Sequence, residues 1–276
     1  MKVKKIVIDK IYVLTLGRPN KQITFDNFPK SIQDITTLVV QPQEEHLFPD
    51  YPKLVLPEDD IGIVRTRKWI YDYAKNQKWG MFDDDLIFKR RTQDWKFPQS
   101  PNEENVLDEE GWNEVLEKTS EWFDSGFSFA GFRRGVLPPF SNGQEYHDCT
   151  ESICAVFGNG PKLPDSNDLV WNFDLLSEDV HFVLQMLLLG HKNRVWDKYI
   201  YENKWAQPGG VSYQRTVDIL DRSHEKLIEL YPDYVKWRKE GDDSHIQLNS
   251  GSEYDGVKLI QILWDKAYND SKIQIQ

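Results

Sequence analysis

The sequence is poor in cysteine and contains no long apolar run. Cys149 and Cys154 are the only cysteines in 276 residues, which is too few for a disulfide framework and favours a reducing, cytoplasmic setting with free thiols. No stretch approaches the roughly 20 consecutive apolar residues of a membrane span, so we expect no membrane partner. The short apolar run that follows the basic start is broken by Asp9 and does not fit a signal peptide.

Common phosphate and metal motifs are also missing. The chain has no Walker loop and no G-x-G-x-x-G run, and its six histidines show no H-x-x-x-H or H-E-x-x-H spacing. His181 falls in an apolar segment, where a satisfied core histidine is expected. His245 remains a candidate for reaching a metal from the C-terminal part. Gly209 and Gly210 are most simply a turn, although their backbone amides could meet a ligand.

The net charge of −11 is unevenly distributed along the chain. Residues 1–91 hold 16 basic and 13 acidic residues, whereas residues 92–125 hold 2 and 10. The first third could therefore face a nucleotide or another polyanion. The balance of the whole chain argues against broad nucleic-acid binding, which relies on Lys and Arg to neutralise phosphates.

Predicted strands alternate with predicted helices, which indicates an α/β fold with a largely parallel central sheet flanked by helices. The predicted strands are 6–16, 35–41, 53–56, 79–82, 127–132, 152–158 and 194–201. The predicted helices are 24–34, 61–77, 111–124, 178–189 and 215–239, the last in two pieces that meet at Pro232. Residues 137–148 have loop composition. Because no convincing linker interrupts the chain, we expect one domain.

Residues 81–88, Met-Phe-Asp-Asp-Asp-Leu-Ile-Phe, place three carboxylates between two apolar runs. This pattern predicts a strand end or tight turn beside the core, where adjacent unpaired carboxylates are costly. A divalent cation would remove that cost, and carboxylate oxygens suit Mg²⁺ or Mn²⁺ bound to substrate phosphates. Along an extended chain Asp83 and Asp85 point to one side and Asp84 to the other, so Asp83 and Asp85 are the expected metal ligands. The alternative is a solvated turn.

The predicted helix 61–77 carries an arginine on its apolar face. Ile63, Arg67, Ile70 and Ala74 follow the helical period, which places Arg67 toward the core. A buried arginine needs an anion, and a carboxylate or a phosphate is the usual partner. The alternatives are that Arg67 pairs with an internal aspartate or extends to the edge of the helix.

Ser177-Glu178-Asp179 stands at the start of the most apolar predicted helix. Ser177 is a plausible N-cap, and acidic residues in a first turn favour the helix macrodipole. Because a helix that is apolar over most of its surface is buried, its first turn can open into an interior cleft. Glu178 or Asp179 could then act as a general base toward a bound hydroxyl.

The order of these motifs resembles that of a GT-A glycosyltransferase. A strand ending in Leu-Thr-Leu-Gly-Arg (14–18) precedes the arginine helix, the triple Asp and Ser-Glu-Asp, and the resemblance covers roughly residues 8–201. It implies a single domain over 1–276, with a nucleotide-binding half at 1–91 and an acceptor half at 126–276. In that family an Asp-x-Asp motif holds Mn²⁺ or Mg²⁺ on the diphosphate of the sugar nucleotide, here through Asp83 and Asp85.

The resemblance also implies roles for residues of the donor and acceptor sites. The donor, most simply a UDP-sugar, would be contacted by Thr15, Arg18, Arg67, Asp83 and Asp84. The family's x-Glu-Asp motif corresponds to Glu178 and Asp179, and its Asp is the base in inverting members. A C-terminal histidine often completes the metal shell in that family, and no residue here matches it firmly.

Within the GT-A group the chain is similar to phage DNA glycosyltransferases, relatives of the base J glucosyltransferase that add sugar to 5-hydroxymethylated pyrimidines. This similarity implies a DNA acceptor and, for a phage-encoded protein, the cytoplasm of the host cell. Arg133 and Arg134, together with Lys89-Arg90-Arg91, would contact DNA phosphates on either side of the target base. The alternative is that these arginines pair with the acidic segment 92–125.

Three other functions are compatible with the same residues. The acceptor could be a carbohydrate or a protein. A metal-dependent nucleotidyl or phosphoryl transferase could use the same three aspartates, and it would turn over nucleotide without moving a sugar. A non-catalytic binding module would carry its acidic runs as solvated surface, and it would show no affinity for nucleotides.

Overall fold

The computed structural model describes residues 8–91, 105–135, 137, 139, 144–147, 154–172, 176–203, 216–238 and 258–273. The strands of the main sheet are β1 Lys10–Leu14, β2 Thr36–Val40, β3 Lys53–Val55, β4 Lys78–Asp83, β5 Leu86–Arg90, β6 Phe129–Arg134, β7 Tyr146–His147, β8 Ala155–Asn159 and β9 Asn193–Asn203. The α-helices are α1 Ile23–Asp26, α2 Lys30–Asp34, α3 Gly62–Tyr73, α4 Glu109–Asp124, α5 Glu178–Leu188, α6 Val217–Leu230 and α7 Trp264–Ile273. A separate two-stranded sheet pairs β10 Val235–Trp237 with β11 Ile260–Ile262.

The main sheet runs in the order β3-β2-β1-β4-β8-β6-β9-β5, and β7 also pairs with β9. Strands β3, β2, β1 and β4 are parallel to one another, as the sequence predicts. Strand β8 is antiparallel to both of its neighbours, so β6 runs in the same direction as β4. The carboxyl ends of β1, β2, β4 and β6 therefore lie along one edge of the sheet, where ligands of α/β folds gather.

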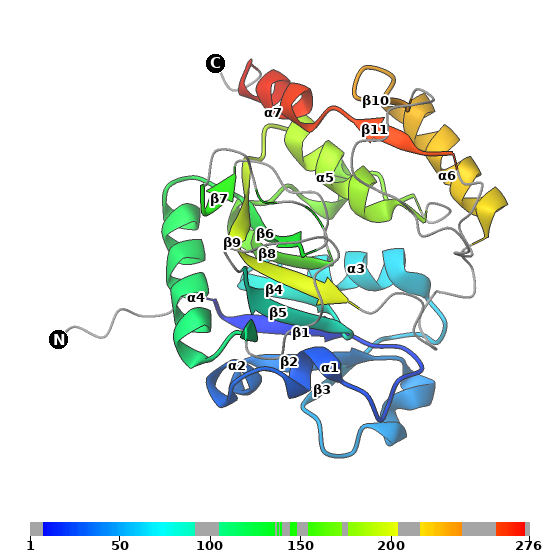
Figure 1. The fold of residues 1–276 in the computed structure, drawn as a ribbon. Helices are drawn as coiled ribbons and strands as arrows, with labels where there is room; N and C mark the ends of the chain where they lie inside the picture. The colour runs from blue at the N-terminus through cyan, green and yellow to red at the C-terminus, as the bar shows by residue number, and fades with distance from the viewer. Residues whose placement is uncertain are drawn as a thin grey trace.

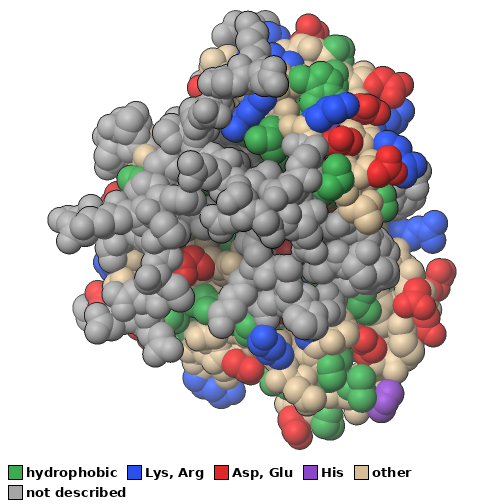
Figure 2. Space-filling model, turned by 45° about the vertical axis from the view of Figure 1, so that its right-hand side comes forward, with side chains coloured by type: hydrophobic (Ala, Val, Ile, Leu, Met, Phe, Trp, Pro, Cys, Tyr) green, Lys and Arg blue, Asp and Glu red, His purple; other side chains and the backbone are tan. Residues whose placement is uncertain are grey.

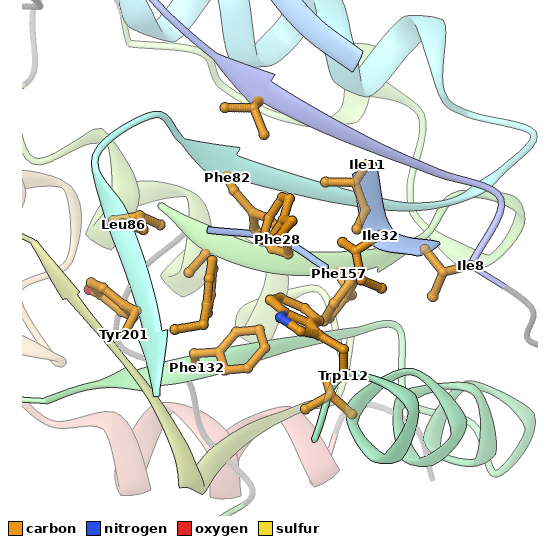
Figure 3. Close-up of a cluster of buried hydrophobic side chains, with 14 of the residues drawn as sticks. Ile8, Ile11, Phe28, Ile32, Phe82, Leu86, Trp112, Phe132, Phe157 and Tyr201 are labelled. Atoms are coloured by element: carbon orange, nitrogen blue, oxygen red, sulfur yellow. The ribbon is translucent and has the colours of Figure 1, made fainter. Parts of the chain in front are cut away.

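Alternation along the strands divides the core into two layers, one on each face of the sheet (Figure 1). Ile11 and Val13 of β1 pack on one face, and Tyr12 and Leu14 pack on the other. Figure 3 shows the first layer, in which Trp112 of α4 meets aromatic side chains from α1–α2 and from the strands. Helices α3 and α5 contribute to the second layer, together with residues from α6 and α7.

The fold class predicted from sequence is confirmed, and most predicted elements form within a few residues of their expected ends. The expected helix 24–34 is split into α1 and α2. The second helical piece after Pro232 is wrong, because residues 235–237 form strand β10. Val235 and Trp237 alternate with Lys236, and the pairing partner of this strand is β11, more than 20 residues further along the chain.

Among the described residues, no helix is both long and apolar enough to cross a membrane. On the face in Figure 2 the described acidic and basic side chains are interspersed. No broad area of one sign covers the described part of that face.

Candidate active site

The chain turns sharply after β1 and brings Arg18 back toward the triple Asp. Gly17 makes this turn possible with a positive φ of 70°, and its amide donates to the carboxylate of Glu44 at 2.8 Å. Arg18 Nη1 then lies 2.5 Å from Asp84 Oδ1 and 3.2 Å from Asp85 Oδ2. Thr15 Oγ1 donates to the other oxygen of Asp84 at 2.7 Å. Thr15 and Arg18, both predicted donor residues, therefore meet at Asp84.

The three aspartates do not alternate as an extended strand would. Strand β4 ends at Asp83, and Asp84 and Asp85 form the turn that leads into β5. Asp83 pairs with Arg67 on α3, whereas Asp84 and Asp85 share Arg18. The geometric argument for grouping Asp83 with Asp85 is thus wrong, because a turn replaces the strand from Asp84 onward.

Thr24 fixes the backbone of this turn, and the sequence analysis missed it. Its hydroxyl donates to the carbonyl of Asp83 at 2.6 Å and accepts from the amide of Leu86 at 2.8 Å. The amide of Thr24 donates to the carbonyl of Asp84 at 3.0 Å. Thr24 is fully buried at the start of α1. A threonine between the apolar residues Ile23 and Phe25 was the only signal that could have revealed it.

Arg67 connects the triple Asp to the first turn of α5. It is only 3% exposed on the core side of α3, as the helical period predicts. Its Nη2 lies 3.0 Å from Asp83 Oδ1, and its Nη1 lies 3.1 Å from Glu178 Oε1. Two motifs almost 100 residues apart in sequence are therefore joined through one guanidinium. The sequence predicts an anionic partner for Arg67, and in the structure that partner is a pair of carboxylates, those of Asp83 and Glu178.

The first turn of α5 presents both acidic residues at the site. Ser177 occupies the predicted N-cap position, but its side chain makes no capping hydrogen bond. Glu178 is held by Arg67, and Asp179 Oδ1 accepts from the amide of Val180 at 2.8 Å. Most of the rest of the helix is buried, and His181 is a satisfied core residue, bonded to the carbonyl of Val170 and the hydroxyl of Tyr231.

Burial perturbs the protonation of several of these groups. Burial raises the pKa of Asp84 to about 6, although Arg18 and the Thr15 hydroxyl oppose the rise. Burial also raises the pKa of Glu178, against the opposing effect of Arg67. Burial alone would lower the pKa of Arg67, but Asp83 and Glu178 raise it overall, so this guanidinium stays charged. Shifted carboxyl groups gathered at one sheet edge are typical of functional sites.

A divalent cation fits only part of this constellation. Both oxygens of Asp84 are engaged, by Arg18 and Thr15. The side chains of Asp83 and Asp85 are more accessible, at 33% and 15% exposed. Within the described ranges, no three His, Cys, Asp or Glu side chains are grouped so that they could hold a metal ion. Asp83 and Asp85 could thus supply one or two ligands, and the rest would come from substrate oxygens and water.

A small cavity lies beside Arg67 and Glu178, between α3 and α5. Four of its lining residues are apolar or aromatic, and the other five are polar or charged. The lining residues are Val64, Arg67, Val170, Trp171, Asn172, Glu178, His181, Phe182 and Gln185. The guanidinium of Arg67 therefore faces a hollow as well as two carboxylates.

The basic residues predicted to contact an acceptor are largely engaged inside the protein. Arg133 is 9% exposed and lies 3.4 Å from Asp197 of β9, which also binds Arg91. Arg134 donates to Asn203 at 3.4 Å. Lys89 is buried within β5 and pairs with Glu202 at 2.6 Å. Arg133 and Arg134 do lie at the same sheet edge as Asp83, and their acceptor role stays a prediction.

Other candidates from the sequence fall outside the described residues. These are His245, Gly209, Gly210, Cys149 and most of the loop 137–148. Cys154 is described and is half-buried.

Comparison with known proteins assigns the chain to a family. Residues 9–210 match the TET-associated glycosyltransferase family. Two relatives named beta-glucosyl-HMC-alpha-glucosyl-transferase, from Enterobacteria phages T2 and T6, are each 24% identical over 247 residues, which is 86% of this chain and 85% of theirs. The solved structure of S. aureus TarS 1-349 with UDP-GlcNAc aligns with a TM-score of 0.49 at 12% identity, over 79% of this chain and 66% of that one. The expected glycosyltransferase is confirmed: the chain belongs to the TET-associated glycosyltransferase family and is an enzyme of sugar transfer.

Proposed function

We propose that this enzyme transfers a sugar from a UDP-sugar to a hydroxyl on a 5-hydroxymethylated pyrimidine in DNA. The observation that carries the proposal is the pair of ion contacts that Arg67 makes. Its guanidinium contacts Asp83 of the predicted donor motif and Glu178 of the predicted acceptor motif, so the two motifs lie next to each other. Sugar transfer needs both substrates in one place, with a base near the acceptor hydroxyl.

The donor site is proposed at the edge where β1, β2 and β4 end. Thr15, Arg18 and the Asp83–Asp85 turn lie there, and the TarS structure that aligns with the chain was solved with UDP-GlcNAc. Asp83 and Asp85 would hold Mn²⁺ or Mg²⁺ together with the donor diphosphate. The bound ion would offset the charge that grows on the leaving diphosphate.

Asp179 is proposed as the general base. Glu178 is committed to Arg67, and Asp179 stands next to it in the first turn of α5, where the resemblance places the base. As the acceptor oxygen bonds to the sugar carbon, the bond from that carbon to the diphosphate breaks, and the hydroxyl proton passes to the Asp179 carboxylate. Glu178 is the positioning residue, because it fixes the first turn of α5 against Arg67.

The DNA acceptor is proposed from the phage relatives, whose names specify glucosylated hydroxymethylcytosine (HMC). Those names also favour a second acceptor, the hydroxyl of a sugar already attached to the base. Of the two arginines at the end of β6, Arg134 is the better candidate for a phosphate contact, because Arg133 is buried against Asp197. The cytoplasm of a host cell is the corresponding compartment.

The test is transfer of labelled sugar from UDP-sugars to DNA of defined modification. Duplexes containing hydroxymethylcytosine, glucosylated hydroxymethylcytosine, methylcytosine and unmodified cytosine are compared, with oligosaccharide and protein acceptors alongside. Labelling confined to the duplexes with hydroxymethylcytosine or glucosylated hydroxymethylcytosine supports the proposal. Which of these two duplexes is labelled shows whether the acceptor hydroxyl belongs to the base or to the attached sugar. Label only on a carbohydrate or protein would refute the DNA acceptor and leave the glycosyltransferase family assignment intact. Release of free nucleotide with no sugar moved would favour phosphoryl or nucleotidyl chemistry.

A further inference from the structure

Arg18 already neutralises the carboxylates that a cation would have to approach. Its Nη1 contacts Asp84 Oδ1 at 2.5 Å and Asp85 Oδ2 at 3.2 Å, and its side chain is 10% exposed. Arg67 does the same for Asp83 on the other side of the turn. Two guanidinium groups, one of them buried, thus pair with the three carboxylates of the predicted metal motif.

Hydrogen bonds anchor the backbone at Arg18, so its guanidinium can be moved by rotation of the side chain alone. Gln22 Nε2 donates to the carbonyl of Arg18 at 2.7 Å and to Thr15 Oγ1 at 2.9 Å. Thr24 holds the opposite side of the contact through the carbonyls of Asp83 and Asp84. A rotation of the Arg18 side chain would therefore leave the Asp turn in place.

We propose that Arg18 is a resident counter-ion of Asp84 and Asp85, displaced from Asp85 by a divalent cation and received by the donor diphosphate. This inference rests on the proposed metal-dependent transfer. A cation and a guanidinium repel each other, so they do not share the Asp85 carboxylate at contact distance without cost. A guanidinium that has given up Asp85 can bind a second anion beside Asp84, and a diphosphate suits its planar donors.

The exchange couples metal binding to donor binding. Without a donor, the cation binds weakly because it must separate Arg18 from Asp85. With a donor, the displaced guanidinium gains a new partner, so the cation binds more tightly. By thermodynamic linkage the cation tightens donor binding by the same factor.

The experiment measures Mn²⁺ binding to the full chain, with and without UDP, for the wild type and Arg18→Gln. We expect Arg18→Gln to bind Mn²⁺ alone at least about fivefold more tightly than the wild type, the lower end of typical coupling factors. UDP should tighten Mn²⁺ binding less in Arg18→Gln than in the wild type. Lys75→Gln is the matched control, because it removes one exposed positive charge from the end of α3 and should leave both affinities unchanged.

Equal Mn²⁺ affinities for the wild type and Arg18→Gln would overturn the proposal for Arg18 and leave the metal-dependent transfer standing. A wild type that binds no Mn²⁺ even with UDP would overturn both, and transfer in EDTA would then show whether the enzyme works without metal. If Arg18→Gln fails to fold by circular dichroism, Arg18→Met decides. It also removes the charge that contacts Asp84 and Asp85, so Mn²⁺ should bind Arg18→Met more tightly than the wild type, and equal affinities would overturn the proposal.

Discussion

Arg67 Nη1 lies 3.1 Å from Glu178 Oε1, while Nη2 of the same guanidinium lies 3.0 Å from Asp83 Oδ1. One buried arginine therefore fixes the distance between a strand end and a helix start that belong to different parts of the sequence. Helix α3, which carries Arg67, packs against the same face of the sheet as α5. We therefore expect a displacement of either carboxylate to shift the other through the Arg67 guanidinium.

Replacing Arg67 should damage stability and catalysis together. Arg67→Met leaves Glu178 and Asp83 without their shared cation, and losing one partner of a buried ion pair costs about 3–5 kcal/mol. We expect the lower end, because Asp83 is one-third exposed. Urea unfolding measures the loss, with Lys75→Met as the exposed control. If the double variant Arg67→Met/Glu178→Gln is no less destabilised than the sum of the single variants, the two residues are not coupled.

Metal and nucleotide should stabilise the protein most when they are present together. Asp83 and Asp85 can supply only part of a cation shell, so the donor diphosphate must supply more of it. A ligand at 100 times its dissociation constant adds about 2.7 kcal/mol by mass action. Thermal unfolding with UDP, Mn²⁺ or both tests this, and Asp85→Ala should abolish the extra shift and the transfer activity. Identical melting temperatures with and without Mn²⁺ would contradict the metal bridge.

Much of this site follows from pattern, and the rest depends on tertiary contacts. The helical period places Arg67 toward the core because a helix face is a local property, but nothing local identifies Glu178 as its partner. The alternation argument failed at Asp84 because strand β4 ends one residue earlier. Strand β10 was missed because its pairing partner is β11, Ile260–Ile262, which is distant in the sequence. The role of Thr24 was missed for the same reason, because its hydrogen bonds reach residues 59 to 62 positions away in the sequence.

Thr24→Val should loosen the Asp turn. The substitution keeps the shape of the side chain but removes the hydroxyl, which donates to the carbonyl of Asp83 and accepts from the amide of Leu86. Leaving these buried groups unsatisfied costs about 1–3 kcal/mol. Thr36→Val is the matched control, because Thr36 is equally buried and bonds the carbonyl of Ile32. Both variants should lose stability, but only Thr24→Val should weaken UDP binding, measured by calorimetry. Equal UDP affinities in the two variants would count against the role of Thr24.

The titration of Asp84 should appear in the pH dependence of stability. Its pKa is about 6 in the folded protein and near 3.8 in the unfolded chain, so the folded state binds the proton more tightly. The resulting stability is fully present below pH 4 and is lost as the pH rises to about 6. Asp84→Asn cannot titrate, so its stability relative to the wild type should rise by up to about 3 kcal/mol between pH 4 and pH 7. Urea unfolding in EDTA measures this, with the exposed Asp34→Asn as control. A constant difference across this range would disprove the assignment.

The last prediction separates the two acidic residues of α5. Asp179→Asn removes the proposed base, and general-base catalysis contributes about 10²- to 10⁴-fold, so kcat should fall by that amount while UDP binding is retained. Glu178→Gln keeps the size of the side chain but breaks the ion pair with Arg67. It should lower kcat less than Asp179→Asn does and, unlike Asp179→Asn, reduce stability.

The pH profile of kcat provides the independent readout. If Asp179 is the base, the acid limb of the profile should persist in Glu178→Gln and vanish from the residual activity of Asp179→Asn. The opposite pattern, with the limb lost only in Glu178→Gln, would make Glu178 the base. Its pKa, which burial raises, would then be matched to a proton acceptor near neutral pH, and Arg67 would act as the group that holds that base in its ionised form.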